Sequence, residues 1–469
     1  MVLAIAKICS FYFHMHENSS DDRKALSAPA PLAQRFYDTL IAMQHAPATS
    51  LAQFQENVLK DLIEAVAAEN AFYRARLAPV LDRNGKADLA SWHKIPILSQ
   101  ADVITHADRL RAASIPKQHG RIFRYQSSGT TGASIAYYRS ELADLAATCG
   151  QHRHAATMNA DWSRDLALIR AFDPALSRFR RPQAESGRKQ SWGPSWLAAE
   201  NLGTVHRLSV FTPLAQQAAW LADRGPVYLN TFPSNALALA RYVRNNAAVK
   251  PQLLAIFTAG EPITANVRRE VEAHLGCPCH DLISNAEFGM IAAECPAGEG
   301  YHLQSELARI ELLGQNERPV KAGQWGRVVI TPLYNFAMPL IRFDTGDLAM
   351  YKADMCSCGR QHPLIGPVYG RPANLMRVGK QGWTRPNLAS ETIERHLPGC
   401  RWQVVQISPR KAELRYMRRN PSAVVNEAGA RKQASQALGS GLSIIVREVA
   451  ALGPSASGKF LAFVSQSVN

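Results

Sequence analysis

The segment 127–132 has the composition of a loop that could wrap an anion. It combines two glycines with four hydroxyl side chains, as Ser127, Ser128, Gly129, Thr130, Thr131 and Gly132. Glycine lets successive backbone N–H groups converge on one point, and the hydroxyls add donors. Strand-like stretches flank it at 122–125 and 135–138. The segment lacks the Gly-Lys-Ser/Thr ending of a Walker loop, and taken alone it also fits a hairpin turn.

Polar residues recur in four further segments downstream. The segments are 258–262, 284–289, 341–347 and 457–459, and the first directly follows the apolar run 253–257. The residues in and near them that could bind or react are Gly260, Glu261, Glu287, Asp347, Arg371 and Lys459. Any one segment could arise by chance, but an ordered set of five is much harder to obtain that way.

In this order and at these separations, the segments resemble the adenylate-forming (acyl-CoA synthetase-like) superfamily. The run 356–360, Cys-Ser-Cys-Gly-Arg, is similar to the phenylacetate-CoA ligase branch, and the resemblance extends over roughly residues 35 to 469. It implies ATP-dependent activation of a carboxylic acid to an acyl-adenylate, then transfer to a thiol, which is expected to be coenzyme A or a carrier phosphopantetheine. The acid is expected to be aromatic, because this branch favours aryl and arylacetic acids.

The resemblance also implies which residues bind the nucleotide. The loop 127–132 would hold the β- and γ-phosphates of ATP, and Gly260 and Glu261 would line the adenine pocket. Asp347 would accept hydrogen bonds from the ribose hydroxyls, with Arg371 beside it. An alternative for Asp347 is a purely structural Asx-type turn around residues 345–346.

Two charged residues are implied to act near the reacting groups. Glu287 would hold Mg²⁺, since a hard cation prefers oxygen ligands. Lys459 would reach between the carboxylate of the acid and the α-phosphate, where a flexible ammonium suits developing charge; the alternative is an ordinary exposed lysine. The carboxylate is already ionised at pH 7, so the reaction requires positioning and charge stabilisation rather than a general base.

The sequence departs from the superfamily pattern at several positions near these motifs. Ile283 stands where an aromatic usually stacks on adenine, and Ala286 where a hydroxyl usually precedes the glutamate. Ala133 replaces a common lysine, and Asn374 occupies the hinge position. These departures keep open a non-catalytic nucleotide-binding homologue. Because the sequence does not decide the acceptor, an adenylyltransferase that loads a carrier protein or an amine is a second alternative.

Four residues have side chains that suit a structural zinc site. Cys295 and His302 flank the Pro/Gly-bearing loop 296–300, and Cys356 and Cys358 form a tight knuckle. Three thiolates and an imidazole would give the closed, tetrahedral coordination of structural zinc. Some phenylacetate-CoA ligase-like proteins pair these two loops in a similar way. A competing set, disfavoured because it lies where an apolar strand enters the sheet, is Cys277, Cys279 and His280.

Strands that alternate with helices from about residue 120 indicate an α/β fold. Apolar runs at 166–169, 227–229 and 253–257 predict buried strands, and helical patterns lie at 235–243 and 264–275. This is the pattern expected of a large, multi-layer N-terminal domain of adenylate-forming type.

The chain is long enough for more than one core, and three parts are expected. Residues 1–31 would be a flexible tail, 32–370 the adenylate-forming N-terminal domain, and 371–469 a small, mobile α+β C-terminal lid domain. The elements expected in the last part are a helix after Asn387, paired strands at 402–407 and 412–417, a helix at 422–438 and a strand at 442–446.

The composition is that of a globular protein, with 46% hydrophobic and 19% charged residues. A formal net charge of +15 suits ATP and coenzyme A, whereas the scatter of the basic residues disfavours nucleic acid as a partner. No uncharged stretch reaches membrane-spanning length, and eight cysteines are too few for a disulfide scaffold in a chain of 469 residues. A cytoplasmic protein is therefore expected. An acyl carrier protein and a second copy of the chain, as a homodimer, are further partners left open.

Overall fold

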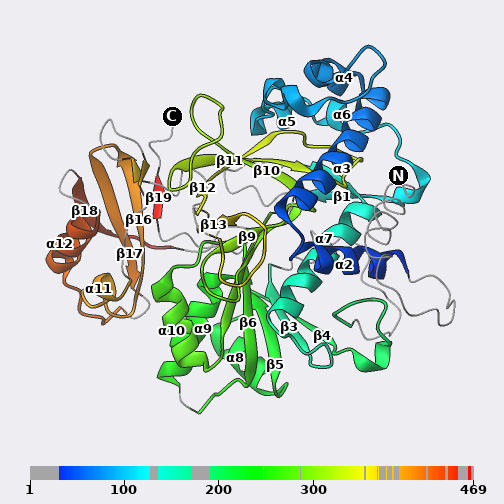
Figure 1. Ribbon diagram of the computed structural model, residues 1–469. Helices are drawn as coiled ribbons and strands as arrows, with labels where there is room; N and C mark the ends of the chain where they lie inside the picture. Colours follow the sequence, from blue (N-terminus) through cyan, green and yellow to red (C-terminus); the bar gives the residue numbers. More distant parts are fainter. Residues whose placement is uncertain are drawn as a thin grey trace.

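The computed structural model contains three β-sheets of three or more strands, with helices packed on them (Figure 1). The residues that it describes are 31–126, 136–171, 191–246, 248–285, 287–352, 355–366, 368, 376–377, 383–384, 390–418, 421–438, 442–452 and 463–465. The predicted phosphate loop 127–132, Arg371 and Lys459 therefore lie outside the described residues, as do Ala133, Ala286 and Asn374. None of the described helices is both long enough and apolar enough to span a membrane.

The largest sheet has eight strands, in the order β13-β9-β8-β7-β6-β5-β3-β4. Neighbours from β4 through β7 are parallel, and β8, β9 and β13 extend the sheet antiparallel. The strands are β3 (Leu166–Arg170), β4 (Val205–Ser209), β5 (Val227–Thr231), β6 (Leu253–Ala259), β7 (Cys279–Asn285), β8 (Gly289–Glu294), β9 (Tyr301–Leu303) and β13 (Leu364–Ile365). Parallel strands are buried on both faces, which is why short apolar runs predicted three of them correctly.

Helices cover both faces of this sheet. Ile169, Leu229 and Ile256 point to one face, whereas Tyr228 and Phe257 point to the other, as neighbouring residues of a strand must. The covering helices are α8 (Leu214–Ala222), α9 (Pro233–Asn245) and α10 (Ala265–Leu275) on the first face and α7 (Glu141–Thr157) on the second. The helices expected at 235–243 and 264–275 are thus confirmed as α9 and α10.

A second, three-stranded antiparallel sheet packs beside β8 and β9. It consists of β10 (Ala308–Leu313), β11 (Trp325–Pro332) and β12 (Phe343–Met350). A shared cluster that includes Ala292, Leu312 and Ile330, none of them exposed to solvent, joins the two sheets. The strand that carries Asp347 is therefore fixed against the strands that follow the Glu287 turn.

The N-terminal helices and one hairpin enclose the largest hydrophobic cluster. Helix α3 contributes the fully buried Leu59, Leu62 and Ile63. Leu340 and Phe343, which come much later in the sequence, belong to the same cluster. The helices, turns and hairpin that enclose the cluster are α2 (Leu32–Met43), α3 (Ala48–Glu69), α4 (Ala71–Leu77), α5 (Gln100–Thr105), α6 (Ala107–Leu110), the 3-10 turns 78–80, 89–94 and 117–119, and the strands β1 (Ile122–Gln126) and β2 (Ala136–Ser140). The sequence predicted β1 and β2 as the two strands around the glycine-rich segment, and they pair antiparallel.

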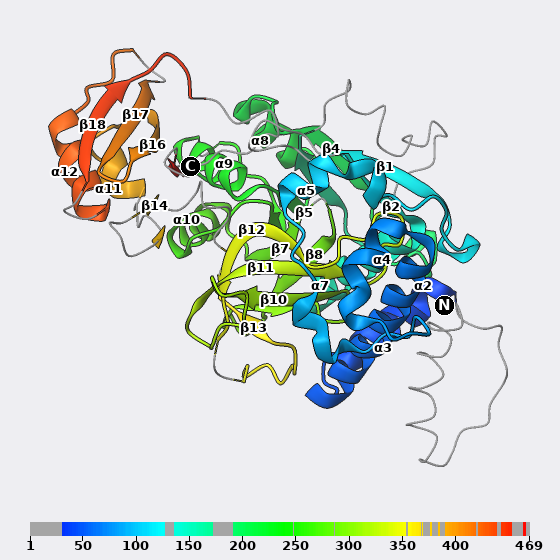
Figure 2. The same cartoon turned by 90° about the horizontal axis from the view of Figure 1, so that it is seen from above.

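The C-terminal part has a sheet and a core of its own, seen at one end of the molecule in Figures 1 and 2. Its elements are β14 (Met376–Arg377), β15 (Trp383–Thr384), α11 (Ser390–Glu394), β16 (Cys400–Ser408), β17 (Lys411–Arg418), α12 (Glu427–Leu438), β18 (Ser443–Glu448) and β19 (Phe463–Ser465). The four-stranded order is β18-β17-β16-β19, and β19 was not expected from the sequence. The helix expected from residue 422 begins later, because the Asn426 side chain caps it by accepting a hydrogen bond from the Gly429 N–H at 2.8 Å.

One cluster of charges joins this C-terminal part to the main sheet. Arg241 on α9 bonds the Glu270 carboxylate of α10 at 2.7 Å and the Glu394 carboxylate of α11 at 2.5 Å. Both views place the C-terminal sheet next to α9 and α10. The expected division of the chain at residue 371 falls among residues outside those described, and it stays a prediction.

Candidate functional site

The predicted nucleotide-binding residues Gly260, Glu261 and Glu287 lie at one edge of the main sheet. Gly260 and Glu261 come directly after β6, and Glu287 follows β7 by two residues. Gly260 has a φ of 88°, a left-handed conformation that favours glycine. Open α/β sheets bind ligands beyond the carboxyl ends of their parallel strands, and this is the edge that these residues occupy.

The Glu261 carboxylate is buried and bonded to the beginning of helix α9. Its oxygens accept hydrogen bonds from the Ser234 backbone N–H at 2.9 Å and from the Ser234 hydroxyl at 3.0 Å. Ser234 is the second residue of α9, so the negative charge lies at the positive end of the helix dipole. Glu261 was predicted to line the adenine pocket; it also ties β6 to α9, a contact that no sequence pattern indicates.

Glu287 lies in a turn that is packed against the beginning of β12. The Phe288 N–H donates a hydrogen bond to Asn285 Oδ1 at 2.9 Å, which closes the turn around Glu287. The rings of Phe288 and Phe343 are 5.6 Å apart between centroids, and Phe343 is the first residue of β12. The turn that carries Glu287 and the strand that carries Asp347 therefore belong to one packed unit.

Asp347 lies half-buried on β12, and it is not the carboxylate that forms the neighbouring turn. Asp344 forms that turn, because its Oδ1 accepts a hydrogen bond from the Gly346 N–H at 2.9 Å. Gly346 has a φ of 76°, and the Asp347 N–H donates to Thr345 Oγ1 at 3.1 Å. Asp344 thus forms an Asx-type turn here, while ribose binding by Asp347 stays a prediction.

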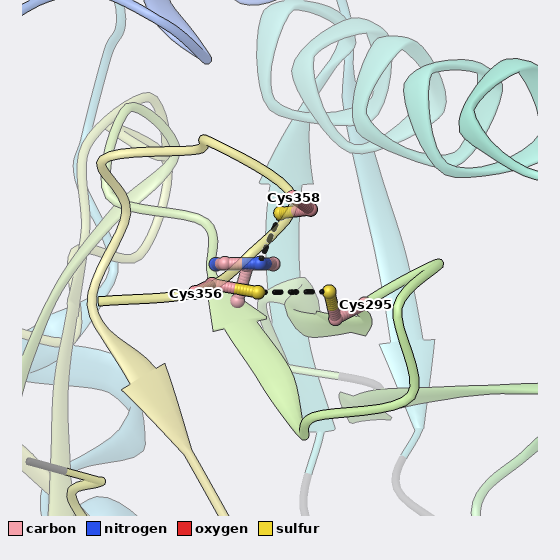
Figure 3. Close-up of side chains that lie close together, drawn as sticks. Cys295, Cys356 and Cys358 are labelled. Atoms are coloured by element: carbon pink, nitrogen blue, oxygen red, sulfur yellow. Dashed lines mark hydrogen bonds between the residues drawn. The ribbon is translucent and has the colours of Figure 1, made fainter. Parts of the chain in front are cut away.

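Cys295, His302, Cys356 and Cys358 converge as their residue types predicted (Figure 3). One ligand atom from each lies within 4.8 Å of all the others. Cys295 Sγ is 3.1 Å from Cys356 Sγ, and Cys358 Sγ is 3.2 Å from His302 Nε2. Two segments far apart in the sequence meet here because β13 pairs with β9, placing Leu364 opposite His302. A set of soft thiolates and one imidazole fits a tetrahedral metal ion.

The buried network behind His302 orients its ring. His302 Nδ1 lies 3.2 Å from the His362 carbonyl oxygen, so that Nδ1–H donates there and Nε2 faces the sulfurs. The His362 side chain bonds Glu306 at 2.8 Å, and Arg153 bonds the same carboxylate at 2.7 Å. Burial alone would raise the pKa of Glu306, but Arg153 and His362 lower it well below its usual range. Glu306 therefore stays ionised and holds the side chain of His362, whose backbone carbonyl bonds the His302 ring.

The competing cysteines do not form a second metal-binding cluster among the described residues. Cys277 and Cys279 are buried in the apolar cluster under α8, α9 and α10. Burial raises the pKa of each thiol to about 12, which keeps it protonated at neutral pH. The one group of His, Cys, Asp and Glu side chains in the described parts of the chain that could hold a metal ion is the set around His302.

A buried acidic cluster beneath the Glu287 turn was not predicted. Asp281 on β7 accepts hydrogen bonds from the Thr258 hydroxyl at 2.5 Å and from the Tyr301 hydroxyl at 2.8 Å. Glu294 on β8 accepts one from the Asp281 N–H at 2.8 Å and pairs with Arg268 at 2.7 Å. Burial raises the pKa of Asp281 to about 7, against the lowering effect of the two hydroxyls. The order of the strands in the sheet brings these groups together, and no local sequence motif predicts the cluster.

The raised pKa of Asp281 predicts a pH-dependent stability. Between about pH 4 and 7 the folded state holds a proton that the unfolded state has lost, so the free energy of unfolding falls as the pH rises through this window. Asp281→Asn should weaken this dependence by a few kcal/mol at most, since one pKa unit is about 1.4 kcal/mol. Melting curves from pH 5 to 8 test it, with the exposed Asp108→Asn as the matched control. The same dependence of melting temperature on pH in wild type and in Asp281→Asn would contradict a raised pKa at Asp281.

No protein-family model matches the chain. Two curated proteins that match it are phenylacetate-coenzyme A ligase of Thermus thermophilus and Protein CapK of Staphylococcus aureus. The first is 26% identical over 347 residues, which cover 72% of this chain and 74% of the ligase. The second is 20% identical over 349 residues, which cover 71% of this chain and 70% of CapK.

Solved structures share the fold over nearly the whole chain. A 2-hydroxyisobutyryl-CoA ligase in the postadenylation state superposes with a TM-score of 0.66 at 19% identity, covering 96% of this chain and 95% of the ligase. The same ligase in the thioesterification state gives 0.58 at 18% identity, with the same coverage. These findings confirm the resemblance read from the sequence: the chain is similar in fold to the adenylate-forming superfamily and in sequence to its phenylacetate-CoA ligase-like branch.

Proposed function

We propose that the protein activates a carboxylic acid with ATP to an acyl-adenylate and transfers the acyl group to coenzyme A. The observation that carries the proposal is the match to the Thermus thermophilus phenylacetate-CoA ligase over 72% of this chain. The position of Gly260 and Glu287 at the carboxyl edge of the main sheet, with Asp347 on the adjoining sheet, supports it. An aromatic acid is the proposed substrate class, because the relative is named for phenylacetate.

The proposed reaction proceeds by two displacements. A carboxylate oxygen of the acid attacks the α-phosphorus of ATP, and the bond to the β-phosphate oxygen breaks to release pyrophosphate. The sulfur of coenzyme A then attacks the acyl carbon, its proton goes to water, and AMP leaves. Neither step oxidises or reduces a group, so the protein has to position the reactants and stabilise charge on phosphate. Asp347 would hold the ribose, and Lys459 the oxygens between the acid and the α-phosphate.

Two metal ions belong to the proposal. Glu287 would hold Mg²⁺, which neutralises charge on the phosphates of ATP. Zinc would occupy the site made by Cys295, His302, Cys356 and Cys358, where it ties two loops together rather than reacting. Burial lowers the pKa of His302 to about 4, so the imidazole is neutral at physiological pH, as a metal ligand must be.

Acid-dependent exchange of labelled pyrophosphate into ATP tests the proposed function. Purified protein with Mg²⁺ should exchange the label only when a suitable acid from an aryl and arylacetic panel is present. Adding coenzyme A and measuring the thioester then tests the second displacement. Exchange without thioester would favour the adenylyltransferase that loads a carrier protein or an amine. Tight ATP binding with no exchange for any acid would favour the non-catalytic homologue, the reading that Ile283 and Ala286 motivate.

Asp347→Ala should weaken ATP binding by about 2 kcal/mol, or roughly 30-fold, because the ribose loses a charged acceptor. Calorimetric titration with ATP measures the change directly. Asp223→Ala, which removes an exposed carboxylate at the end of α8, is the matched control and should bind ATP normally. Equal affinities in wild type and Asp347→Ala would remove Asp347 from the nucleotide site.

The cytoplasm is the proposed location of the protein. The cysteines that the structure describes form no disulfide with one another, which agrees with a reducing compartment. A carrier protein as acceptor and a homodimer stay open predictions. Size-exclusion chromatography with light scattering settles the second of them.

A further inference from the structure

Arg170, the last residue of β3, lies where the order of the main sheet changes direction. From β3 the chain adds β4 on one side, then crosses to the other side to form β5, β6 and β7. Ligands of open α/β sheets bind at the carboxyl edge beside such a switch point. Between β3 and β5, that edge is formed by Arg170 and by the last residues of β5. Neither the motifs nor the composition of the sequence indicates a role for Arg170.

The Arg170 guanidinium spans three neighbouring strands. Its Nε and Nη2 donate to Asn230 Oδ1 on β5 at 2.9 and 2.6 Å, and its Nη1 donates to the Ala259 carbonyl on β6 at 2.9 Å. Ala259 directly precedes Gly260, so the cation lies beside the predicted nucleotide-binding loop. The guanidinium also stacks over the Phe232 ring, 4.5 Å from its centroid. These contacts hold the group in one place and one plane.

The same contacts leave part of the guanidinium unused. A guanidinium has five N–H donors, and the three bonds to Asn230 and Ala259 leave one donor on each terminal nitrogen without a partner among the described residues. Glu261 and Asp281 act on its charge from a distance. Burial lowers the pKa of Arg170 to about 10, which leaves it charged at pH 7. A half-buried cation with two spare donors suits an oxygen-bearing ligand.

We propose that Arg170 is a specificity-determining residue, which selects acids that carry a second oxygen-bearing group, a carboxylate or a phenol oxygen, at the end remote from the reacting carboxylate. The proposal rests on the proposed function, since it assigns the substrate class of that same site. The stacked ring of Phe232 and the carbonyl of Ala259 fix the cation, so its spare donors can distinguish acids by where they carry oxygen. A site that bonds a polar group rejects the analogue that lacks the group.

The test compares matched acids in the pyrophosphate exchange reaction. The pairs are phenylacetate against 4-hydroxyphenylacetate and 4-carboxyphenylacetate, and benzoate against 4-hydroxybenzoate. Wild type should have the higher kcat/KM for the oxygen-bearing member of at least one pair. Arg170→Met should lower kcat/KM for that member by about 10- to 100-fold, chiefly through KM, and leave its unsubstituted partner within about threefold. Arg207→Met, on the exposed side of β4, is the matched control and should change neither member.

Other outcomes separate this proposal from competing roles of Arg170. An equal loss for both members of every pair would mean that Arg170 holds the reacting carboxylate or only the fold, and it would overturn the proposal. A wild-type preference for unsubstituted acids would overturn it as well, even if Arg170→Met does not fold. Arg170→Lys, which keeps the charge but not the planar fork, should recover only part of the discrimination.

Calorimetric titration of the same acids separates failure of this proposal from failure of the proposed function. Binding that favours oxygen-bearing acids and depends on Arg170, in a protein without exchange activity, would keep the binding site and reject the ligase. Exchange activity with equal binding of both members of each pair would keep the ligase and reject the role of Arg170.

Discussion

Lys459→Ala should abolish formation of the acyl-adenylate, with a loss of about 100-fold or more in the exchange rate. The expected cause is the loss of one ammonium beside the oxygens that carry charge in the transition state, and removing one such donor commonly costs this much. Transfer to coenzyme A from a chemically supplied acyl-adenylate should be largely intact, because the C-terminal part is predicted to rotate between the half-reactions. The measurement compares the rates of adenylate formation and of transfer to coenzyme A in the same variant.

The control for this experiment is a lysine of the C-terminal part that lies on a helix. Lys432→Ala removes an exposed ammonium from α12 and should change neither half-reaction. Equal losses in both half-reactions of Lys459→Ala would reject the two-orientation mechanism for this protein. No loss in either would make Lys459 an ordinary surface lysine.

Cys356→Ser should remove bound zinc and lower the melting temperature by about 5 °C or more. Wild-type protein prepared without added zinc should contain about one equivalent, because the four ligands form a closed set. Serine replaces a thiolate with a hydroxyl that binds zinc weakly, so the loops carrying Cys295 and Cys358 lose their connection. Metal analysis and a thermal melt of the same preparations measure both effects.

Cys400→Ser is the matched control, since Cys400 is a half-exposed thiol in the C-terminal sheet, remote in sequence from the cluster. This variant should retain zinc and have the melting temperature of wild type. A second variant, Glu306→Gln, removes the charge that pairs with Arg153 and the His362 side chain while keeping the shape of the side chain. It should lower zinc affinity by about 10- to 100-fold. Wild-type protein that is metal-free and fully stable would reduce the four residues to a coincidence of packing.

Local patterns predicted three parallel strands of the main sheet and two of the helices that cover it. The runs that became β3, β5 and β6 are apolar because parallel strands are buried on both faces, and that requirement is visible in a single segment. The late start of α12 was missed because a cap depends on one side chain, Asn426, and not on periodicity. Strand β19 was missed because three residues carry too little pattern.

Residues brought together by strand order were harder to predict. Cys295, His302, Cys356 and Cys358 were predicted because thiols and imidazoles are rare and their spacings are recognisable, although the pairing of β13 with β9 that assembles them is not. Carboxylates and arginines are common, so the buried Asp281 and the position of Arg170 left no sequence signal. Their roles follow only from which strands are neighbours.

The charge cluster at Arg241 makes the arrangement of the two sheets sensitive to ionic strength. Arg241 is shared by Glu270 and Glu394, and Arg241 and Glu394 are each about one quarter exposed, at 25% and 29%. Mobile ions screen exposed charges over a Debye length of about 8 Å at physiological salt and about 3 Å at 1 M, and they screen partly buried pairs such as these much less. The hydrophobic clusters on either side do not respond to salt in this way. Added salt is therefore expected to weaken this junction slightly while leaving both cores unchanged, so that any cycle that reorients the C-terminal sheet would have a small salt dependence even when every substrate is saturating.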